Sequence, residues 1–182
     1  YDHPMSGKLT FKLIRDDYEV DKFVTLSSLN CEELTFNRLD WSETVSTITT
    51  TYTDPDNLYE ISTISYRDLA NPLITGSKTE KKLDSVLYHT PTNALNYAKV
   101  ESLSQGYPLA SFSVVANRTV SDLQIGDAVI VNWVEYSIAK MICRVVDIDY
   151  GGLIDGRVKL ELIEDIYGLG DTTYKLGNGT EW

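Results

Sequence analysis

The feature that most constrains the fold is a strict alternation of apolar and polar side chains near the carboxyl end. Five residues carry it, namely Val158, Lys159, Leu160, Glu161 and Leu162. Successive side chains of a strand point to opposite faces of a sheet, so this repeat predicts a strand with one buried and one wet face. Asp155-Gly156 stands directly before the run, and Asp-Gly at such a place is a strong hairpin signal. Residues 157–163 are therefore expected to pair with a neighbouring strand.

Two further strand patterns precede this hairpin within residues 123–167. A turn at Gly126-Asp127 leads into an apolar run at 128–133, and a longer strand pattern covers 141–148. A glycine-rich loop at 150–156 separates this pattern from the last strand. Three neighbouring strands, two of them joined by a hairpin, predict a small antiparallel sheet or barrel.

The rest of the chain is also rich in strand patterns. β-Branched side chains flank a turn at 54–57, which predicts a β-hairpin over residues 44–66. Shorter strands are predicted at 8–14, 33–36, 82–88 and 109–115.

One segment, residues 92–105, predicts a helix. Four residues at helical spacing would share one face: Ala94, Leu95, Ala98 and Ser102. Thr90 or Thr92 can cap the start, and Pro91 is tolerated in a first turn. Gly106 is a typical helix stop.

Together these patterns predict an α+β, mainly β fold with antiparallel sheets, a small C-terminal β-barrel and one main helix at about 92–105. We expect a β-hairpin-rich α/β segment at 8–107, a small barrel-like domain at 108–167 and a C-terminal tail at 168–182. The tail contains four Gly and no periodicity. This composition predicts either a flexible arm or a segment that docks elsewhere through Trp182.

Composition argues against two kinds of partner. The 182 residues include 27 acidic and 16 basic side chains, which gives a formal net charge of −11. Such a surface repels phosphate, and the only basic cluster, at 78–82, contains Glu80, so we expect no stable binding to nucleic acid. No apolar run has the length needed to span a bilayer and no signal peptide begins the chain, so we expect no membrane span.

No motif for catalysis or for a cofactor stands out. His3 and His89 are isolated, whereas a zinc site needs several ligands at close spacing. The densest acidic region comprises Asp147, Asp149, Asp155, Glu161, Glu164 and Asp165. Its spacing differs from that of a calcium-binding loop, although Asp147 and Asp149 would share one strand face and suit a weak cation site. A carboxylate pair for glycoside hydrolysis is another alternative, but a solvated sheet face is the simpler interpretation. We therefore predict no catalytic, cofactor-binding or metal-binding residue.

The two cysteines are far apart in the sequence. Cys31 and Cys143 do not form the Cys-x-x-Cys spacing of a redox or metal motif. Cys143 lies within the strand pattern at 141–148, so we predict that it is a small buried apolar residue. Two isolated cysteines fit a reducing compartment.

Aromatic side chains offer another kind of site. One group surrounds the proposed barrel and a second surrounds the hairpin at 44–66: Trp133, Tyr136 and Tyr150, then Trp41, Tyr52, Tyr59 and Tyr66. Such side chains line carbohydrate platforms and protein interfaces, and they also pack in ordinary cores. The sequence leaves both interpretations open.

Several segments stand in an order that matches a known group of proteins. They are 8–15 (KLTFKLIR), 41–52 (WSETVSTITTTY), 67–71 (RDLAN), 92–104 before 108–110, 123–127 (LQIGD), 141–150 (MICRVVDIDY) and 156–167, which ends in Glu-Asp-Ile-Tyr. This order resembles the tail proteins of long-tailed bacteriophages, a group that includes tail-tip attachment and baseplate hub proteins. The resemblance covers roughly residues 8–169 and depends on order and spacing rather than on one specific motif.

The resemblance implies a structural virion protein and not an enzyme. It implies assembly with other tail proteins at the end of the tail tube, namely tube, distal-tail, tip or fibre proteins. Hubs of this group form threefold rings whose β-barrels match the symmetry of the tube, so it also implies a homotrimer in which residues 108–167 form a hub domain. The protein would be made in the host cytoplasm and reside in the virion. The alternative is a carbohydrate- or receptor-binding β module of a phage or bacterial surface protein that uses the exposed aromatic side chains.

Overall fold

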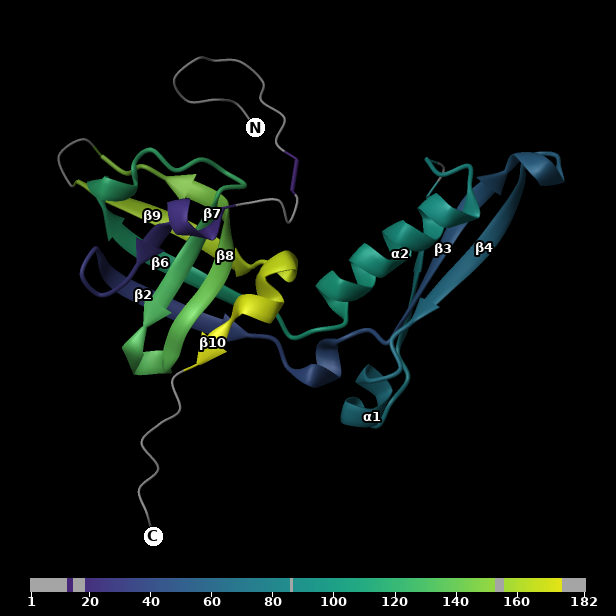
Figure 1. Cartoon of the computed structure of the whole chain (residues 1–182), viewed down its shortest axis with the longest axis horizontal. Coiled ribbons are helices and arrows are strands. Elements are labelled where there is room, and N and C mark those ends of the chain that lie inside the picture. Colours follow the sequence, from purple (N-terminus) through teal and green to yellow (C-terminus); the bar gives the residue numbers. More distant parts are fainter. Residues whose placement is uncertain (1–12, 15–18, 86, 153–155, 175–182) are drawn as a thin grey trace, which may run out of the picture. The chain divides into compact units, whose positions relative to one another are not determined.

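The computed structural model of the chain describes residues 13–14, 19–85, 87–152 and 156–174. These residues belong to two compact units (Figure 1). Unit 2 is Arg38–Leu109, and unit 1 consists of the described residues on both sides of it. Unit 2 is thus an insertion between two stretches of unit 1.

Unit 1 is built on a seven-stranded sheet. Its strands are β1 (Val24–Leu26), β2 (Cys31–Arg38), β6 (Ala110–Asn117), β7 (Ala128–Trp133), β8 (Ile138–Asp149), β9 (Arg157–Glu164) and β10 (Thr173–Tyr174). They follow the order β1-β7-β8-β9-β6-β2, and β10 pairs with β8 at the end of β8 that β9 leaves uncovered. The antiparallel pairs β7–β8 and β8–β9 confirm the three neighbouring strands predicted within residues 123–167.

The sheet of unit 1 curls into a half-barrel and does not close (Figure 1). Among the described residues, β1 and β2 form the two ends of the sheet, and their neighbours are β7 and β6. The closed C-terminal barrel predicted from the sequence is therefore wrong. Alternation of apolar and polar residues specifies which face of a strand is buried, but it carries no information on whether the first and last strands meet.

The predicted segment at 8–107 contributes strands to unit 1 as well as to unit 2. β2 contains the short strand predicted at 33–36. β1 pairs with β7 in parallel, so this sheet is not purely antiparallel. The strand predicted at 8–14 lies mostly outside the described residues.

The middle of β8, residues 141–145, is buried on both of its faces. Its inner face contributes Met141, Cys143 and Val145 to the core of the half-barrel. On the outer face Ile142 is covered by the 3-10 helix η6 (Ile166–Asp171), where a Cβ added to Gly168 would lie 2.7 Å from the Cβ of Ile142. Arg144 shares this outer face and is also buried. A strand that is covered on both faces has apolar residues in succession rather than in alternation with polar ones.

Unit 2 is a three-stranded sheet with a helix packed against it (Figure 1). β3 (Thr47–Asp54) and β4 (Glu60–Arg67) pair antiparallel around the 3-10 turn η3 (Pro55–Asn57), which confirms the hairpin predicted at 44–66. β5 (Glu80–Leu83) pairs in parallel with the other edge of β3. The strand predicted at 82–88 therefore begins earlier and is shorter. The position of β5 depends on residues that are far apart in the sequence, because the hydroxyl of Ser46 donates a hydrogen bond to the carbonyl of Thr79, just before β5, at 2.9 Å.

The main helix agrees with its prediction. α2 (Pro91–Gln105) begins after Thr90, whose hydroxyl oxygen accepts a hydrogen bond from the backbone N–H of Asn93 at 3.3 Å. Three small side chains are buried where α2 contacts β3 and β4: Ala94, Ala98 and Ser102. Their small size lets the helix approach the sheet closely. Leu95, which the pattern placed on the same face, is only half-buried.

A short helix, α1 (Asn71–Thr75), occupies the connector between β4 and β5. Pro72 lies in its first turn, where a proline is tolerated because the backbone N–H has no helical acceptor there. Asn71 is buried, and its amide donates to the hydroxyl of Thr44 at 2.7 Å and to the carbonyl of Gly106 at 2.9 Å. This side chain joins the start of unit 2 to the end of α2.

The segment predicted as a tail, 168–182, is described as far as residue 174. Within it, β10 pairs with β8, with Thr173 opposite Lys140. Residues 175–182, including Trp182, lie outside the described part of the chain. None of the described helices is long and apolar enough to cross a membrane.

Candidate functional site

The acidic region divides into two groups with different environments. Asp147 and Asp149 are exposed on β8, opposite Glu161 and Lys159 of β9. The ammonium of Lys159 lies 3.0 Å from a carboxylate oxygen of Glu161, and this hydrogen bond and the nearby carboxylates raise the pKa of Lys159. A lysine therefore supplies positive charge at this exposed group. Among the described residues, no three His, Cys, Asp or Glu side chains come together as metal ligands.

The second acidic group is buried and has structural partners. A guanidinium nitrogen of Arg144 lies 2.8 Å from a carboxylate oxygen of Asp165, and a second one donates to the carbonyl of Gly126 at 3.1 Å. Asp165 also caps η6, because its other oxygen accepts from the backbone N–H of Tyr167 at 3.1 Å. Glu164 accepts from the backbone N–H of Ala110 at 3.1 Å. These carboxylates join β6, β8 and β9. Asp155, the remaining acid of the predicted region, lies outside the described residues.

The cysteines and the described histidine do not form a reactive group. Cys31 and Cys143 are both buried, as predicted for Cys143, and neither is in a disulfide. Burial raises the pKa of the Cys31 thiol to about 11, so it is protonated at neutral pH. His89 is exposed in the loop before α2, and His3 lies outside the described residues.

The first predicted aromatic group does not form an open platform. Trp133 is buried in the core of unit 1. The hydroxyl of Tyr150 donates to the carbonyl of Leu123 at 3.1 Å, and its ring packs against the core. Tyr136 is exposed, but its ring lies 5.3 Å from that of Phe36. These side chains do not present a continuous aromatic surface for a sugar ring.

The second aromatic group is also mostly engaged within its unit. Tyr52 is buried, and Tyr66 is half-buried. The ring of Trp41 lies 6.3 Å from that of Tyr107. Tyr59 alone among this group is largely exposed, with 70% of its surface accessible.

Tyr59 belongs to an exposed apolar group at the turn of the β3–β4 hairpin, which we call the hairpin tip. The hairpin tip consists of Leu58, Tyr59 and Ile61, which are 89%, 70% and 75% exposed. Leu58 and Tyr59 both have left-handed backbones, with φ of 53° and 61°. A bulky residue with positive φ is strained, and strained residues cluster at functional sites. The hairpin tip is therefore a candidate surface for contact with another protein.

A second apolar group surrounds α1. Leu69, Leu73 and Ile74 are 72%, 86% and 57% exposed, and α1 ends at Gly76 with a left-handed φ of 71°. Exposed apolar side chains that lie together on a surface mark contact sites more often than isolated ones do. No pattern described in the sequence predicted this group.

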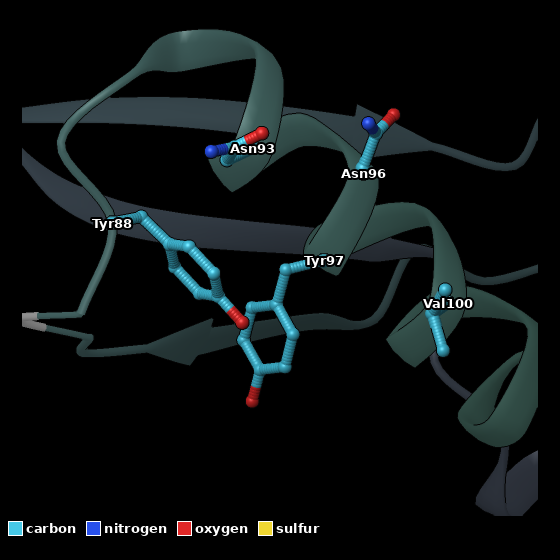
Figure 2. Close-up of a pocket in the computed structure, with 5 residues that line it drawn as sticks. All are labelled: Tyr88, Asn93, Asn96, Tyr97 and Val100. Carbon is cyan, nitrogen blue, oxygen red and sulfur yellow. The ribbon is translucent and has the colours of Figure 1, made fainter. Parts of the chain in front are cut away.

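The sequence also missed a groove formed by α2 and the loop before it, shown in Figure 2. Its lining residues are Tyr88, Asn93, Asn96, Tyr97 and Val100, and its volume is about 320 Å³. The rings of Tyr88 and Tyr97 lie 5.2 Å apart at an angle of 34°. Four of the five lining residues recur at helical spacing on α2, on a different face from the buried Ala94 and Ala98. This spacing is the one sequence signal that points to the groove.

Comparison with known proteins identifies the fold. No family model and no curated protein matches the chain. A chain in the virion of the native gene transfer agent particle has a similar structure, with a TM-score of 0.61 and 12% identity over 85% of this chain. The tail protein from Neisseria meningitidis MC58 matches 78% of this chain at 16% identity and a TM-score of 0.48. Prophage tail protein gp18 from Listeria monocytogenes EGD-e matches 75% of it at 19% identity and a TM-score of 0.44.

These similarities cover only part of each neighbour. The chain spans 34% of the gene transfer agent chain, 44% of the Neisseria protein and 39% of the Listeria protein. At these identities the comparisons show the fold alone. The fold described above is thus also present in part of a chain of the gene transfer agent virion.

Proposed function

We propose that this chain is part of a structural tail protein of a bacteriophage or related particle, and that it acts by contact with other tail proteins. The observation that carries the proposal is the similarity of its fold to a chain of the gene transfer agent virion. The order of its sequence segments resembles tail proteins independently of that similarity. Because one fold can serve several functions, the surfaces of the chain also have to suit assembly. The proposal includes no catalytic step.

The hairpin tip and the apolar group around α1 supply such surfaces. Each group presents three large apolar side chains to solvent. Burying such side chains contributes about 25 cal/mol per Å² of apolar surface, which favours a protein partner. The strained backbone of Leu58 and Tyr59 holds two of these side chains at the end of the hairpin.

We further propose that the chain belongs to a tail tip or baseplate hub and is a homotrimer in the virion. The open half-barrel of unit 1 supports this proposal. In the described part of the chain, β1 and β2 are edge strands, and edge strands have backbone groups available for another chain. A closed ring of subunits satisfies such groups. A net charge of −11 would also prevent DNA from adhering to the subunits.

Electron microscopy tests the location. Antibodies against the chain should label one end of the tail on particles released by a host that carries the gene. Interruption of the gene should give particles with absent or incomplete tails. Complete, infectious particles without this protein would refute the proposed function.

Sedimentation velocity of the full-length protein at several concentrations tests the oligomer. We expect a trimer at the higher concentrations, and a monomer throughout would contradict the trimer without contradicting the tail location. Tyr59→Asp together with Ile61→Asp should prevent incorporation into tails while the circular dichroism spectrum stays unchanged. Leu87→Asp, at an exposed leucine of the same unit outside the tip, is the matched control.

The alternative of a carbohydrate- or receptor-binding module was predicted from the two aromatic groups. Trp133, Tyr52 and Tyr66 are buried or half-buried, so those groups do not favour it. The groove lined by Tyr88 and Tyr97 is a separate candidate site for a carbohydrate.

A further inference from the structure

We propose that the groove of Tyr88 and Tyr97 binds a neutral saccharide. The groove lies within unit 2 and is built from α2 and the loop before it. The proposal does not depend on tail assembly, because it concerns a small ligand and residues outside the hairpin tip and the α1 group.

The arrangement of the two rings favours a flat ligand. Their centroids are 5.2 Å apart and their planes are inclined by 34°, so the two rings partly stack on each other where they line the groove (Figure 2). Two rings at this distance leave no room between them for a quaternary ammonium group, which is bound by rings that surround it. The face of an aromatic ring is electron-rich, and the C–H groups on one face of a sugar ring carry partial positive charge. A sugar ring packed against the groove-facing side of this tyrosine pair matches this surface.

The polar groups around the rings are suited to hydroxyl groups. Asn93 and Asn96 line the groove, and no hydrogen bond of either side-chain amide is found among the described residues. An amide offers both donors and acceptors, as a sugar hydroxyl requires. Burial and the nearby Glu101 raise the pKa of the Tyr97 phenol.

Charge excludes anionic ligands from this site. None of the five lining residues is charged, and Glu101 lies next to Tyr97. The chain as a whole carries a net charge of −11. A sulfated, phosphorylated or uronic-acid-rich glycan would be repelled, so the ligand is a neutral hexose or N-acetylhexosamine chain.

The groove is held in shape by its surroundings. The carbonyl of Tyr88 accepts a hydrogen bond from the backbone N–H of Thr53 at 3.0 Å, which fixes the loop to β3. α2 is capped at Thr90 and packed on the sheet through Ala94 and Ala98. A site built on fixed elements loses little conformational entropy when a ligand binds.

Saturation-transfer NMR on the full chain tests the proposal with four neutral probes: tetrasaccharides of glucose, N-acetylglucosamine, mannose and galactose. We expect at least one to bind in the millimolar range, as suits a small open groove, and to receive saturation from tyrosine ring protons. Asn93→Ala should weaken binding about fivefold, the effect of one net hydrogen bond. Because alanine favours a helix, this variant keeps its fold. Tyr97→Ala should weaken binding at least about tenfold, and Tyr97→Phe should retain most of it.

Matched controls come from the same unit. Tyr59→Ala and Asn57→Ala remove one exposed tyrosine and one exposed asparagine outside the groove, and they should leave the affinity unchanged. If none of the four tetrasaccharides binds, or if Asn93→Ala and Tyr97→Ala bind as tightly as the controls, the proposal is wrong. Binding of tetramethylammonium or of a proline-rich peptide in place of every saccharide would also overturn it.

Discussion

The buried ion pair of Arg144 and Asp165 gives the sharpest test of how unit 1 is stabilised. The two charged groups are 2.8 Å apart, and their side chains are 10% and 2% exposed. In Arg144→Met the apolar stem remains, but the carboxylate of Asp165 loses its charged partner in a site with little water. Breaking a buried pair in this way costs about 3–5 kcal/mol of unfolding free energy. At about 2–4 °C per kcal/mol, the melting temperature should fall by roughly 6–20 °C.

A double-mutant cycle separates the ion pair from other effects of the substitutions. Asp165→Asn keeps an oxygen that can accept from the backbone N–H of Tyr167, but it removes the negative charge. Arg144→Met with Asp165→Asn removes both charges, so it should destabilise by only about 1 kcal/mol, the cost of the lost donor to Gly126. The two single substitutions should therefore cost more in sum than the double substitution does, and the difference is the coupling energy of the pair.

Urea unfolding followed by tryptophan fluorescence provides the measurement. Trp133 lies in the core of unit 1, so replacing Trp41 and Trp182 by Phe leaves a reporter for that unit. Arg157→Met is the control, because Arg157 pairs with Glu32 at 3.0 Å where both side chains are more than half exposed. Such surface pairs contribute about 0–1 kcal/mol. If Arg144→Met were no more destabilising than Arg157→Met, the buried pair would not stabilise unit 1.

Three other predictions test separate features. Gly168→Ala places a Cβ 2.7 Å from the Cβ of Ile142 and should destabilise unit 1 by about 1–3 kcal/mol in the same urea assay, whereas Gly170→Ala, with no atom within 4 Å, should have little effect. Asn71→Leu removes the donor to the carbonyl of Gly106 and should cost unit 2 about 1–3 kcal/mol, measured by the fluorescence of Trp41; an unchanged unfolding midpoint would contradict this. Since the folded pKa of Cys31 is raised to about 11 from 9.0, stability should be full below pH 9 and fall as the pH rises toward 11. Cys31→Ala should remove that part of the alkaline loss, and a thiol reagent should label the native protein slowly.

Local patterns in the sequence predicted the elements well, because the signals for them are local. The alternation at 158–162 appears as β9, the Thr90 cap and Gly106 stop bracket α2, and the turn at 54–57 joins β3 to β4. Each of these depends on side chains within a few residues of one another. The positions of the strands in the sheets depend on contacts between distant residues, and those were not predictable from the pattern.

The errors have specific physical causes. Barrel closure depends on whether β1 meets β2, which no periodicity specifies. The position of β5 depends on the contact of Ser46 with Thr79. Trp133 was considered for a surface site because aromatic composition does not distinguish the two faces of β7, and the structure buries it. Glu164 and Asp165 appeared to be surface acids, but the distant groups of Arg144 and Ala110 are their partners.

The insertion of unit 2 has a consequence for how such a protein can change over evolutionary time. The backbone N–H of Leu39 faces the carbonyl of Leu109 at 3.5 Å, so the insertion leaves and returns at nearly the same point. β2 and β6, which lead into and out of it, are neighbours in the sheet. Because β2 and β6 lie side by side, a short turn could join them in place of unit 2. The sheet of unit 1 therefore tolerates exchange of the whole inserted unit. Descendants of one ancestor can therefore keep the half-barrel and acquire a different guest module in place of residues 38–109.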